Sequence, residues 1–158
     1  MKVFAFHSEV WLPLPPRDVF PFFASAHNLE SITPPWLSFR VLGQRPAEMG
    51  AGTVIDYRLR LHGLPLRWQS EITVWEPPDR FVDVQRRGPY RLWEHEHLFL
   101  PRDGGTLAQD RVRYAVPGGP PLESLVDRLL VRPDLERIFA YRRQRLREIF
   151  GGEGRRER

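Results

Sequence analysis

Between residues 53 and 116, apolar and polar side chains alternate in a series of segments separated by short turns. The alternating segments are residues 53–61, 66–76, 80–86, 90–100 and 106–116. A period of two residues is typical of β-strands, because successive side chains of a strand point to opposite faces of the sheet. Connections this short, such as the one at Asp103 and Gly104, join antiparallel neighbours. This part of the chain therefore predicts an antiparallel sheet of consecutive strands.

Two more strands and two short helices are predicted ahead of this series. Residues 2–12 and 39–44 have strand character, and residues 15–23 and 26–32 between them have helical character. Prolines suit the opening turn of the first helix, and a pair of prolines ends the second. The predicted sheet thus has seven strands, and a sheet of that size is expected to curl.

The last part of the chain has a helical pattern with one apolar face. Apolar residues at helical spacing are Leu122, Leu125, Val126, Leu129, Leu130, Ile138, Phe139, Leu146, Ile149 and Phe150. Pro133 interrupts the pattern and predicts a kink or a split, with Asp134 able to begin a second piece. The concave side of the curled sheet is the only predicted surface large enough to bury the apolar face. We therefore expect a hollow between the sheet and this helix.

The composition is that of a globular protein with a core. Of 158 residues, 41% are hydrophobic and 28% are charged, and we expect residues 1–150 to form one domain and residues 151–158 a flexible arginine-rich tail. No run of about 18 apolar residues predicts a membrane span, and the N-terminus lacks the apolar core of a signal peptide, which favours a cytoplasmic location. The sequence has no cysteine, which excludes disulfides, zinc ribbons and thiol nucleophiles.

The positive charge of the chain does not predict a nucleic-acid binder. The formal net charge is +4, but arginines are scattered among acids along every segment, whereas nucleic-acid binders gather positive charge on one face. The arginines at 142–147 are interpreted as the solvent-exposed face of the last helix. Trp36 and Leu37 are candidates for an apolar lid at the mouth of a cavity, and Trp36 is alternatively a candidate for a contact between two copies. We expect a monomer or a homodimer that neither binds nucleic acid nor inserts stably into a membrane.

One predicted strand carries two histidines between two large aromatic residues. Trp93, His95, His97 and Phe99 have the same parity, so they face the same side of the sheet. A pair of histidines on such a face has three interpretations: a polar network within the core, a metal site, or the wall of a cavity that accepts a mostly apolar guest.

Each interpretation of the histidine pair needs a different partner. For a polar network, Asp110 on the following strand is the obvious choice, because adjacent antiparallel strands bring residues of one face together. A metal site would need a third ligand from elsewhere, with His7, Asp56 and Asp110 as candidates, but the surrounding residues do not match a cupin-type metal motif. We expect no metal ion and no other cofactor. In a cavity wall, the histidines would contact a polar group of the guest.

Several segments, in this order and at this spacing, resemble the START-like, or Bet v 1-like, superfamily and its small bacterial ligand-binding or polyketide cyclase-like members. The segments are residues 14–23 (LPPRDVFPFF), 28–35 (NLESITPP), 52–59 (GTVIDYRL), 75–81 (WEPPDRF), 88–90 (GPY), 93–99 (WEHEHLF), 105–106 (GT) and 110–114 (DRVRY). The resemblance implies an α+β helix-grip fold, in which a curved antiparallel sheet of seven strands surrounds a long C-terminal helix and two short helices follow the first strand. It also implies a pocket for a hydrophobic small molecule between sheet and helix.

The leading hypothesis is a protein that binds or transports a lipid, a polyketide or a similar hydrophobic molecule. The residues expected to contact the ligand are Tyr57, Leu59, Trp68, Ser70, Ile72, Trp93, His95, His97, Phe99, Val112, Tyr114 and Phe139. The alternative is an enzyme of the cyclase or dehydratase type in the same cavity. Its candidate catalytic residues are His95, His97, Asp110 and Tyr114, whose side chains are suited to general acid and base chemistry.

Overall fold

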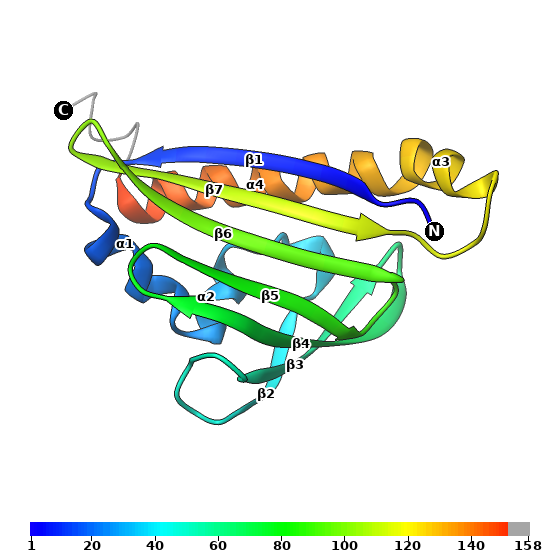
Figure 1. The fold of residues 1–158 in the computed structure, drawn as a ribbon, viewed down its shortest axis with the longest axis horizontal. Coiled ribbons are helices and arrows are strands. Elements are labelled where there is room, and N and C mark those ends of the chain that lie inside the picture. Colours follow the sequence, from blue (N-terminus) through cyan, green and yellow to red (C-terminus); the bar gives the residue numbers. More distant parts are fainter. Residues whose placement is uncertain (152–158) are drawn as a thin grey trace.

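The computed structural model describes residues 1–151 and contains the predicted strands followed by one long helical region (Figure 1). The strands are β1 (Phe4–Leu12), β2 (Arg40–Arg45), β3 (Val54–Leu61), β4 (Leu64–Glu76), β5 (Arg80–Arg87), β6 (Leu92–Arg102) and β7 (Gly105–Ala115). The helices are α1 (Pro16–Phe23), α2 (Ala26–Ser31), the single 3-10 turn η1 (Pro35–Leu37), α3 (Leu122–Val126), the π-helical segment η2 (Asp127–Val131) and α4 (Arg132–Phe150). The predicted order is confirmed, with η1 added after α2. Most of the predicted tail, residues 152–158, lies outside the described residues.

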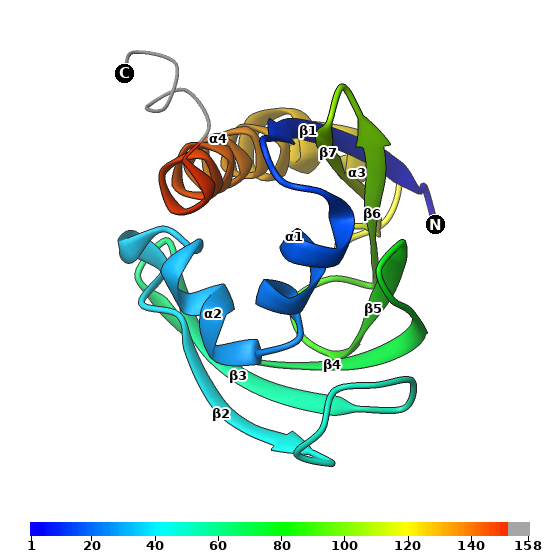
Figure 2. The same cartoon turned by 90° about the vertical axis from the view of Figure 1, so that its left-hand side faces the viewer.

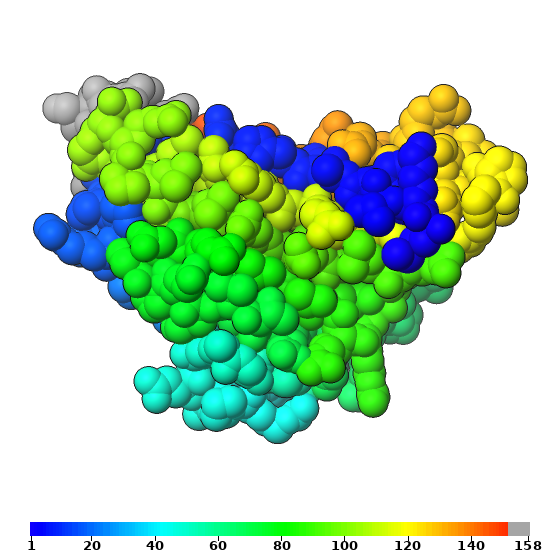
Figure 3. All heavy atoms as spheres, in the orientation of Figure 1, coloured from blue at the N-terminus to red at the C-terminus, as the bar shows by residue number. Residues whose placement is uncertain are grey.

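The strands form one antiparallel sheet in the order β1-β7-β6-β5-β4-β3-β2. The sheet curls around α4, and α1 and α2 lie on its concave side (Figure 2). Its outer face is formed by strand residues, with β1 (blue) along one edge and β2 and the following loop (cyan) along the other (Figure 3). The predicted helix-grip fold is therefore confirmed. Among residues 1–151, no helix is both long and apolar enough to cross a bilayer.

The turn between β3 and β4 is tighter than the sequence predicts. The sequence pattern places a turn over residues 62–65, but β4 already begins at Leu64. His62 and Gly63 both have positive φ angles, 51° and 79°. Two such residues form a hairpin turn whose backbone twist matches that of the flanking strands. Leu64 and Pro65 consequently belong to the sheet, where they pair with β3.

The C-terminal helical region changes its hydrogen-bond pattern next to Pro133, where the sequence predicts a kink or a split. The π turn of η2 directly precedes α4, and Pro133 lies in the first turn of α4. A π turn widens the hydrogen-bond spacing, so the N–H that proline lacks falls where the pattern already changes. The N-cap residue of α4 is Val131, and Asp134 lies in the first turn. Its carboxylate instead accepts hydrogen bonds from His62 and Arg137.

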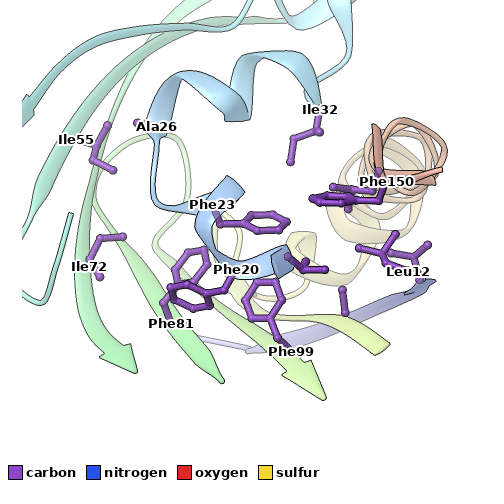
Figure 4. Packing of buried hydrophobic residues seen from close by; sticks show 14 of the residues in the cluster. Leu12, Phe20, Phe23, Ala26, Ile32, Ile55, Ile72, Phe81, Phe99 and Phe150 are labelled. Atoms are coloured by element: carbon purple, nitrogen blue, oxygen red, sulfur yellow. The ribbon is translucent and has the colours of Figure 1, made fainter. Parts of the chain in front are cut away.

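The core consists of two apolar clusters along the concave side of the sheet. In the first, the rings of Phe20 and Phe23 from α1 meet those of Phe81 and Phe99 from β5 and β6 (Figure 4). The ring centroids of Phe20 and Phe23 lie 5.2 and 5.0 Å from that of Phe99. The second cluster joins β1, β6 and β7 to η2 and α4 through Phe6, Trp93, Val112, Tyr114, Val116, Val131, Leu135 and Phe139. Trp68 on β4 packs against both clusters.

Substitution of Phe99 tests the first cluster. We expect Phe99→Ala to lower the free energy of unfolding by about 3–5 kcal/mol, because it leaves a void among close-packed rings. Leu100→Ala is the matched control on the same strand, since Leu100 is 37% exposed and its loss should cost about 0.5 kcal/mol. Chemical denaturation measures both values. Equal losses in the two variants would contradict this arrangement.

Candidate functional site

A cavity of about 190 Å³ lies between the sheet and α4. Apolar and aromatic side chains form most of its lining, and polar side chains gather on the strand side. Among the residues predicted to contact a ligand, those that line it are Tyr57, Leu59, Trp68, Ser70, Trp93, His95, His97 and Phe139. The other lining residues are Leu29, Ile32, Thr33, Leu37, Phe39, Leu61, Asp83, Tyr90, Leu135, Ile138 and Arg142. The cavity thus combines a mostly apolar lining with one polar wall.

A larger hollow, of about 590 Å³, lies along β2, β3 and β4. Four exposed arginines contribute to its lining: Arg40, Arg58, Arg60 and Arg67. A hollow dominated by charged side chains does not suit an apolar guest, so the smaller cavity inside the fold is the better candidate site.

The polar wall of the cavity is built from two histidines and two carboxylates in a crossed arrangement. In the sheet register His95 lies directly opposite Asp83, and His97 directly opposite Asp110. The hydrogen bonds run along the diagonals instead: Nε2 of His95 contacts Oδ1 of Asp110 at 2.8 Å, and Nε2 of His97 contacts Oδ2 of Asp83 at 2.6 Å. The expected pairing of a histidine with Asp110 is confirmed for His95.

Stacked rings hold the two imidazoles in place. The ring centroids of His95 and His97 are 3.7 Å apart, and the ring of Phe81 stacks on His97 at 3.9 Å. Rings packed face to face in this way leave little rotational freedom to the side chains. The crossed hydrogen bonds therefore come from a rigid stack rather than from mobile surface groups.

Arg142 joins α4 to this wall. Its Nη2 donates to Oδ1 of Asp110 at 3.2 Å and to Nδ1 of His97 at 3.3 Å. Guanidinium groups only donate and carboxylates only accept, so Nδ1 of His97 carries no proton and its Nε2–H donates to Asp83. This tautomer makes His97 a neutral imidazole with both nitrogens engaged.

Burial and the neighbouring charges together shift the pKa values of the members of this cluster. Burial lowers the pKa of His97 well below its ordinary value, and His95 and Arg142 lower it further against the effect of Asp110. Burial alone would raise the pKa of Asp110, but Arg142 and His95 together hold it well below its usual range. For Asp83, burial is the largest influence and raises the pKa, although His95 and Arg142 oppose it.

Asp83, His95 and His97 are also arranged as a possible set of metal ligands. Each offers a ligand atom within 4.8 Å of the others. The sequence offers His7, Asp56 and Asp110 as third ligands, whereas the structure brings Asp83 to the pair. The same nitrogen and oxygen atoms already form the hydrogen bonds of the network, and the Arg142 guanidinium is 3.3 Å from His97. A cation would have to displace these bonds beside a fixed positive charge, so the geometry suits a hydrogen-bonded network better than a metal centre.

Tyr57, Trp68 and Ser70 extend the polar part of the lining onto β3 and β4. The indole Nε1–H of Trp68 donates to Oγ of Ser70 at 3.0 Å. Burial raises the pKa of Tyr57 above its ordinary value, and the carboxylate of Asp83 raises it further, against a hydrogen bond from Ser70. Tyr57 therefore keeps its O–H proton and remains a hydrogen-bond donor next to the cavity.

The remaining predicted ligand contacts lie in the core rather than at the cavity. Ile72 and Phe99 belong to the first apolar cluster, and Val112 and Tyr114 to the second. Tyr114 is fully buried, and its hydroxyl donates to the carboxylate of Asp127 in η2. Of the candidate catalytic residues, His95 and His97 line the cavity, Asp110 lies behind His95, and Tyr114 points to a different network.

A further hollow of about 210 Å³ lies beside the cavity, between η1, the β3–β4 turn and α4. It shares Leu37, Leu61 and Ile138 with the cavity lining. Two contacts involve residues that line this hollow. The rings of Trp36 and Tyr141 meet with centroids 5.9 Å apart, and Nε2 of His62 lies 2.7 Å from Oδ2 of Asp134. Trp36 is 54% exposed, which fits its predicted place at the mouth of a cavity.

Asp83 and Arg142 are the two charged lining residues that the sequence analysis missed. Asp83 has the parity of Phe81 on β5, and that parity faces the concave side. The sequence pattern predicts that the arginines at 142–147 face solvent, but the side chain of Arg142 is only 11% exposed. It stands between Phe139 and Leu146 on the buried stripe of α4. A charged residue at an apolar position of a helical stripe is the signal that could have identified it.

Comparison with protein families gives a match over most of the chain. Residues 12–138 match the model of a family described as "Polyketide cyclase / dehydrase and lipid transport". A comparison with curated proteins gave no significant match.

Several solved structures share the fold along nearly the whole chain. A protein from Thermus thermophilus, TTHA0849, is 23% identical over 90% of this chain and 96% of its own, with a TM-score of 0.64. The Zhui aromatase/cyclase from Streptomyces sp. R1128 is 14% identical over 94% and 96%, with a TM-score of 0.67. Norcoclaurine synthase from Thalictrum flavum is 13% identical over 96% and 88%, with a TM-score of 0.69. At these identities the likeness concerns the fold.

The neutral state of His97 predicts a pH dependence of stability. Its pKa is lower in the folded than in the unfolded chain, so its contribution is present above about pH 6.5 and is lost as the pH falls. Below pH 6.5, His97 should contribute a slope approaching ~1.4 kcal/mol per pH unit. We expect His97→Gln to show a shallower fall in unfolding free energy between pH 7.5 and about 5.5. Exposed His27→Gln is the control and should follow the wild type; a wild-type slope in His97→Gln would refute the assignment.

Proposed function

Because the chain belongs to the polyketide cyclase/dehydrase and lipid transport family, we propose that it binds a hydrophobic small molecule in the cavity between the sheet and α4. This membership confirms the predicted resemblance to the START-like, or Bet v 1-like, superfamily. The observation that carries the proposal is the cavity itself, with its apolar lining and single polar wall. Small-molecule sites combine a mostly apolar interior with a few fixed polar groups in this way.

The cavity volume sets the size of the guest. An apolar protein cavity of about 150 Å³ accepts benzene. A volume of about 190 Å³ therefore suits a compound somewhat larger than benzene, such as one with two fused rings. We infer that the hollow beside Ile138 is the opening through which the guest enters, because this residue lines both the hollow and the cavity.

Filling the opening tests the binding proposal. We expect Ile138→Trp to reduce the affinity for neutral naphthalene derivatives at least tenfold, because the indole ring would occupy the space between mouth and cavity. Ile149→Trp is the matched control on α4, since Ile149 is 38% exposed and does not line the cavity. Isothermal titration gives the affinities, and native mass spectrometry of gently purified protein shows whether it already carries a guest. Wild-type protein that binds no member of a broad panel of hydrophobic compounds would overturn the proposal.

Catalysis in the same cavity is the second candidate function. It is favoured by the neutral imidazole of His97 and the adjacent His95, which line a cavity together with Asp83. The similar structures include an aromatase/cyclase and norcoclaurine synthase, whose names describe enzymes. In this chain the acid and base would be His95 and its carboxylate partner, since Tyr114 is engaged with Asp127.

Substitution of His95 separates binding from catalysis. If the chain is an enzyme, His95→Gln should retain affinity for the substrate within about threefold and lower turnover by about 10²- to 10⁴-fold, the usual contribution of a general acid or base. Product formation from polyketide-like substrates, followed by mass spectrometry, measures turnover. If wild-type protein binds such compounds and returns them unchanged, the enzyme hypothesis is wrong and the binding proposal stands.

A further inference from the structure

Four arginines line the hollow of about 590 Å³ that lies along β2, β3 and β4. Three of them, Arg40, Arg58 and Arg67, lie directly opposite one another on the three strands. Arg60 follows two residues after Arg58 and therefore faces the same side of the sheet. This is the outer side, because Tyr57, the residue before Arg58, lines the apolar cavity on the concave side. These four residues form the arginine cluster.

The positive charge of the arginine cluster is largely uncompensated within the chain. Arg58 and Arg67 form no hydrogen bond or ion pair with any residue between 1 and 151, the part of the chain that the structure describes. Arg40 lies 3.6 Å from a carboxylate oxygen of Glu30, and Arg60 donates to a backbone carbonyl oxygen at 3.4 Å. Like charges that lie directly opposite on neighbouring strands destabilise a sheet, so this arrangement has a cost that an external anion would remove.

Other carboxylates on the same face of β3 and β4 already have partners. Asp56 on β3 accepts hydrogen bonds from Arg45 at 3.1 Å and from Gln69 at 3.0 Å. Glu71 on β4 pairs with Arg86. A rearrangement of these side chains toward the arginine cluster would break existing contacts. The missing negative charge therefore has to come from outside the chain.

The spacing of the arginine cluster favours an anion with several charged groups. Neighbouring strands are about 4.8 Å apart, so the Cα atoms of Arg40 and Arg67 lie about 10 Å apart across β3. A single phosphate pairs fully with one guanidinium fork or two, and it leaves the others uncompensated. A chain of linked phosphates presents oxygen atoms along its length, and each guanidinium can bind a pair of them. The hollow also has the volume of a typical small-molecule site.

The surroundings of the arginine cluster favour a small soluble anion over an anionic bilayer. The outer face of the sheet also carries the carboxylates of Asp56, Glu71, Glu94 and Glu96. A flat bilayer of anionic lipids would bring its headgroups against these carboxylates as well as against the arginines. None of the four lines the hollow, so a small anion can occupy it without contacting them.

We propose that the arginine cluster binds a soluble compound with two or more linked phosphate groups, such as a nucleoside triphosphate. Arg58 stands at the centre of the cluster, between Arg40 and Arg67, and is the residue that contributes most to recognition. The site lies on the opposite face of the sheet from the apolar cavity, and it does not depend on whether an apolar guest binds there.

Inorganic triphosphate is the probe for this site, with inorganic phosphate and citrate as comparison compounds. Arg58→Gln removes the central guanidinium, and Arg58→Lys keeps the charge but loses the planar fork. Arg111→Gln is the matched control, because Arg111 is exposed on the outer face of β7, does not line the hollow, and gives the same change in net charge. Isothermal titration of the full chain, in a buffer free of phosphate and sulfate, measures the affinities.

We expect inorganic triphosphate to bind wild-type protein at least about tenfold more tightly than phosphate or citrate, with a dissociation constant below about 1 mM. Arg58→Gln should weaken binding about tenfold, Arg58→Lys about threefold, and Arg111→Gln less than about twofold. Equal losses in Arg58→Gln and Arg111→Gln would show that net charge alone attracts the anion and would overturn the proposal. Absence of triphosphate binding, or equally tight binding of citrate, would do the same.

Thermal unfolding checks that the variants fold. Arg58→Gln should have a Tm at or above that of wild-type protein, because it removes two like-charge neighbours and breaks no pairing. A lower Tm would contradict the uncompensated state of the cluster. Triphosphate should raise the Tm of wild-type protein more than that of Arg58→Gln. Co-sedimentation with phosphatidylserine vesicles tests the other source of phosphate, and protein that binds vesicles but not triphosphate would overturn the assignment to a soluble ligand.

Discussion

The contact between Arg142 and Asp110 is the interaction on which the polar wall depends. Asp110 is buried, and a carboxylate in such a place remains charged only when it is paired. The guanidinium that pairs with it also donates to Nδ1 of His97, which fixes the tautomer and directs the other nitrogen to Asp83. Arg142 of α4 therefore contacts side chains of β6 and β7 directly, and through His97 it is linked to Asp83 on β5. The hydrogen bonds of the wall therefore form only when α4 packs on the sheet at the register that brings Arg142 to Asp110 and His97.

The fold was predictable because its determinants are local. Alternation, turn residues and the apolar stripe of the last helix each act over a few residues, and together they leave few ways to arrange seven strands and one helix. The structure differs from the predicted elements where the backbone geometry does not follow from the pattern of apolar and polar residues. His62 adopts a left-handed conformation to close a two-residue turn, and the π turn before Pro133 absorbs a proline that would interrupt a regular α-helix.

The site was less predictable, because parity identifies a face but not what fills it. His97 and Phe99 point to the same side, yet His97 lines the cavity while Phe99 packs into an aromatic cluster with α1. Strand register places His95 opposite Asp83, but stacking of the two imidazoles directs each histidine to the diagonal carboxylate. Such choices depend on side-chain packing between distant segments, which no pattern within one strand contains.

The persistence of a cavity follows from the same network. An apolar wall could be covered by larger side chains from α4, as in the two clusters on either side, with a gain in buried area. At this wall the covering side chain is Arg142, whose guanidinium donates to Asp110 and His97. Apolar side chains that filled the space would complete the burial of the charged pair of Arg142 and Asp110, and the cost of that burial would offset the gain in contact area. The charged network thus opposes the filling of the cavity by apolar side chains.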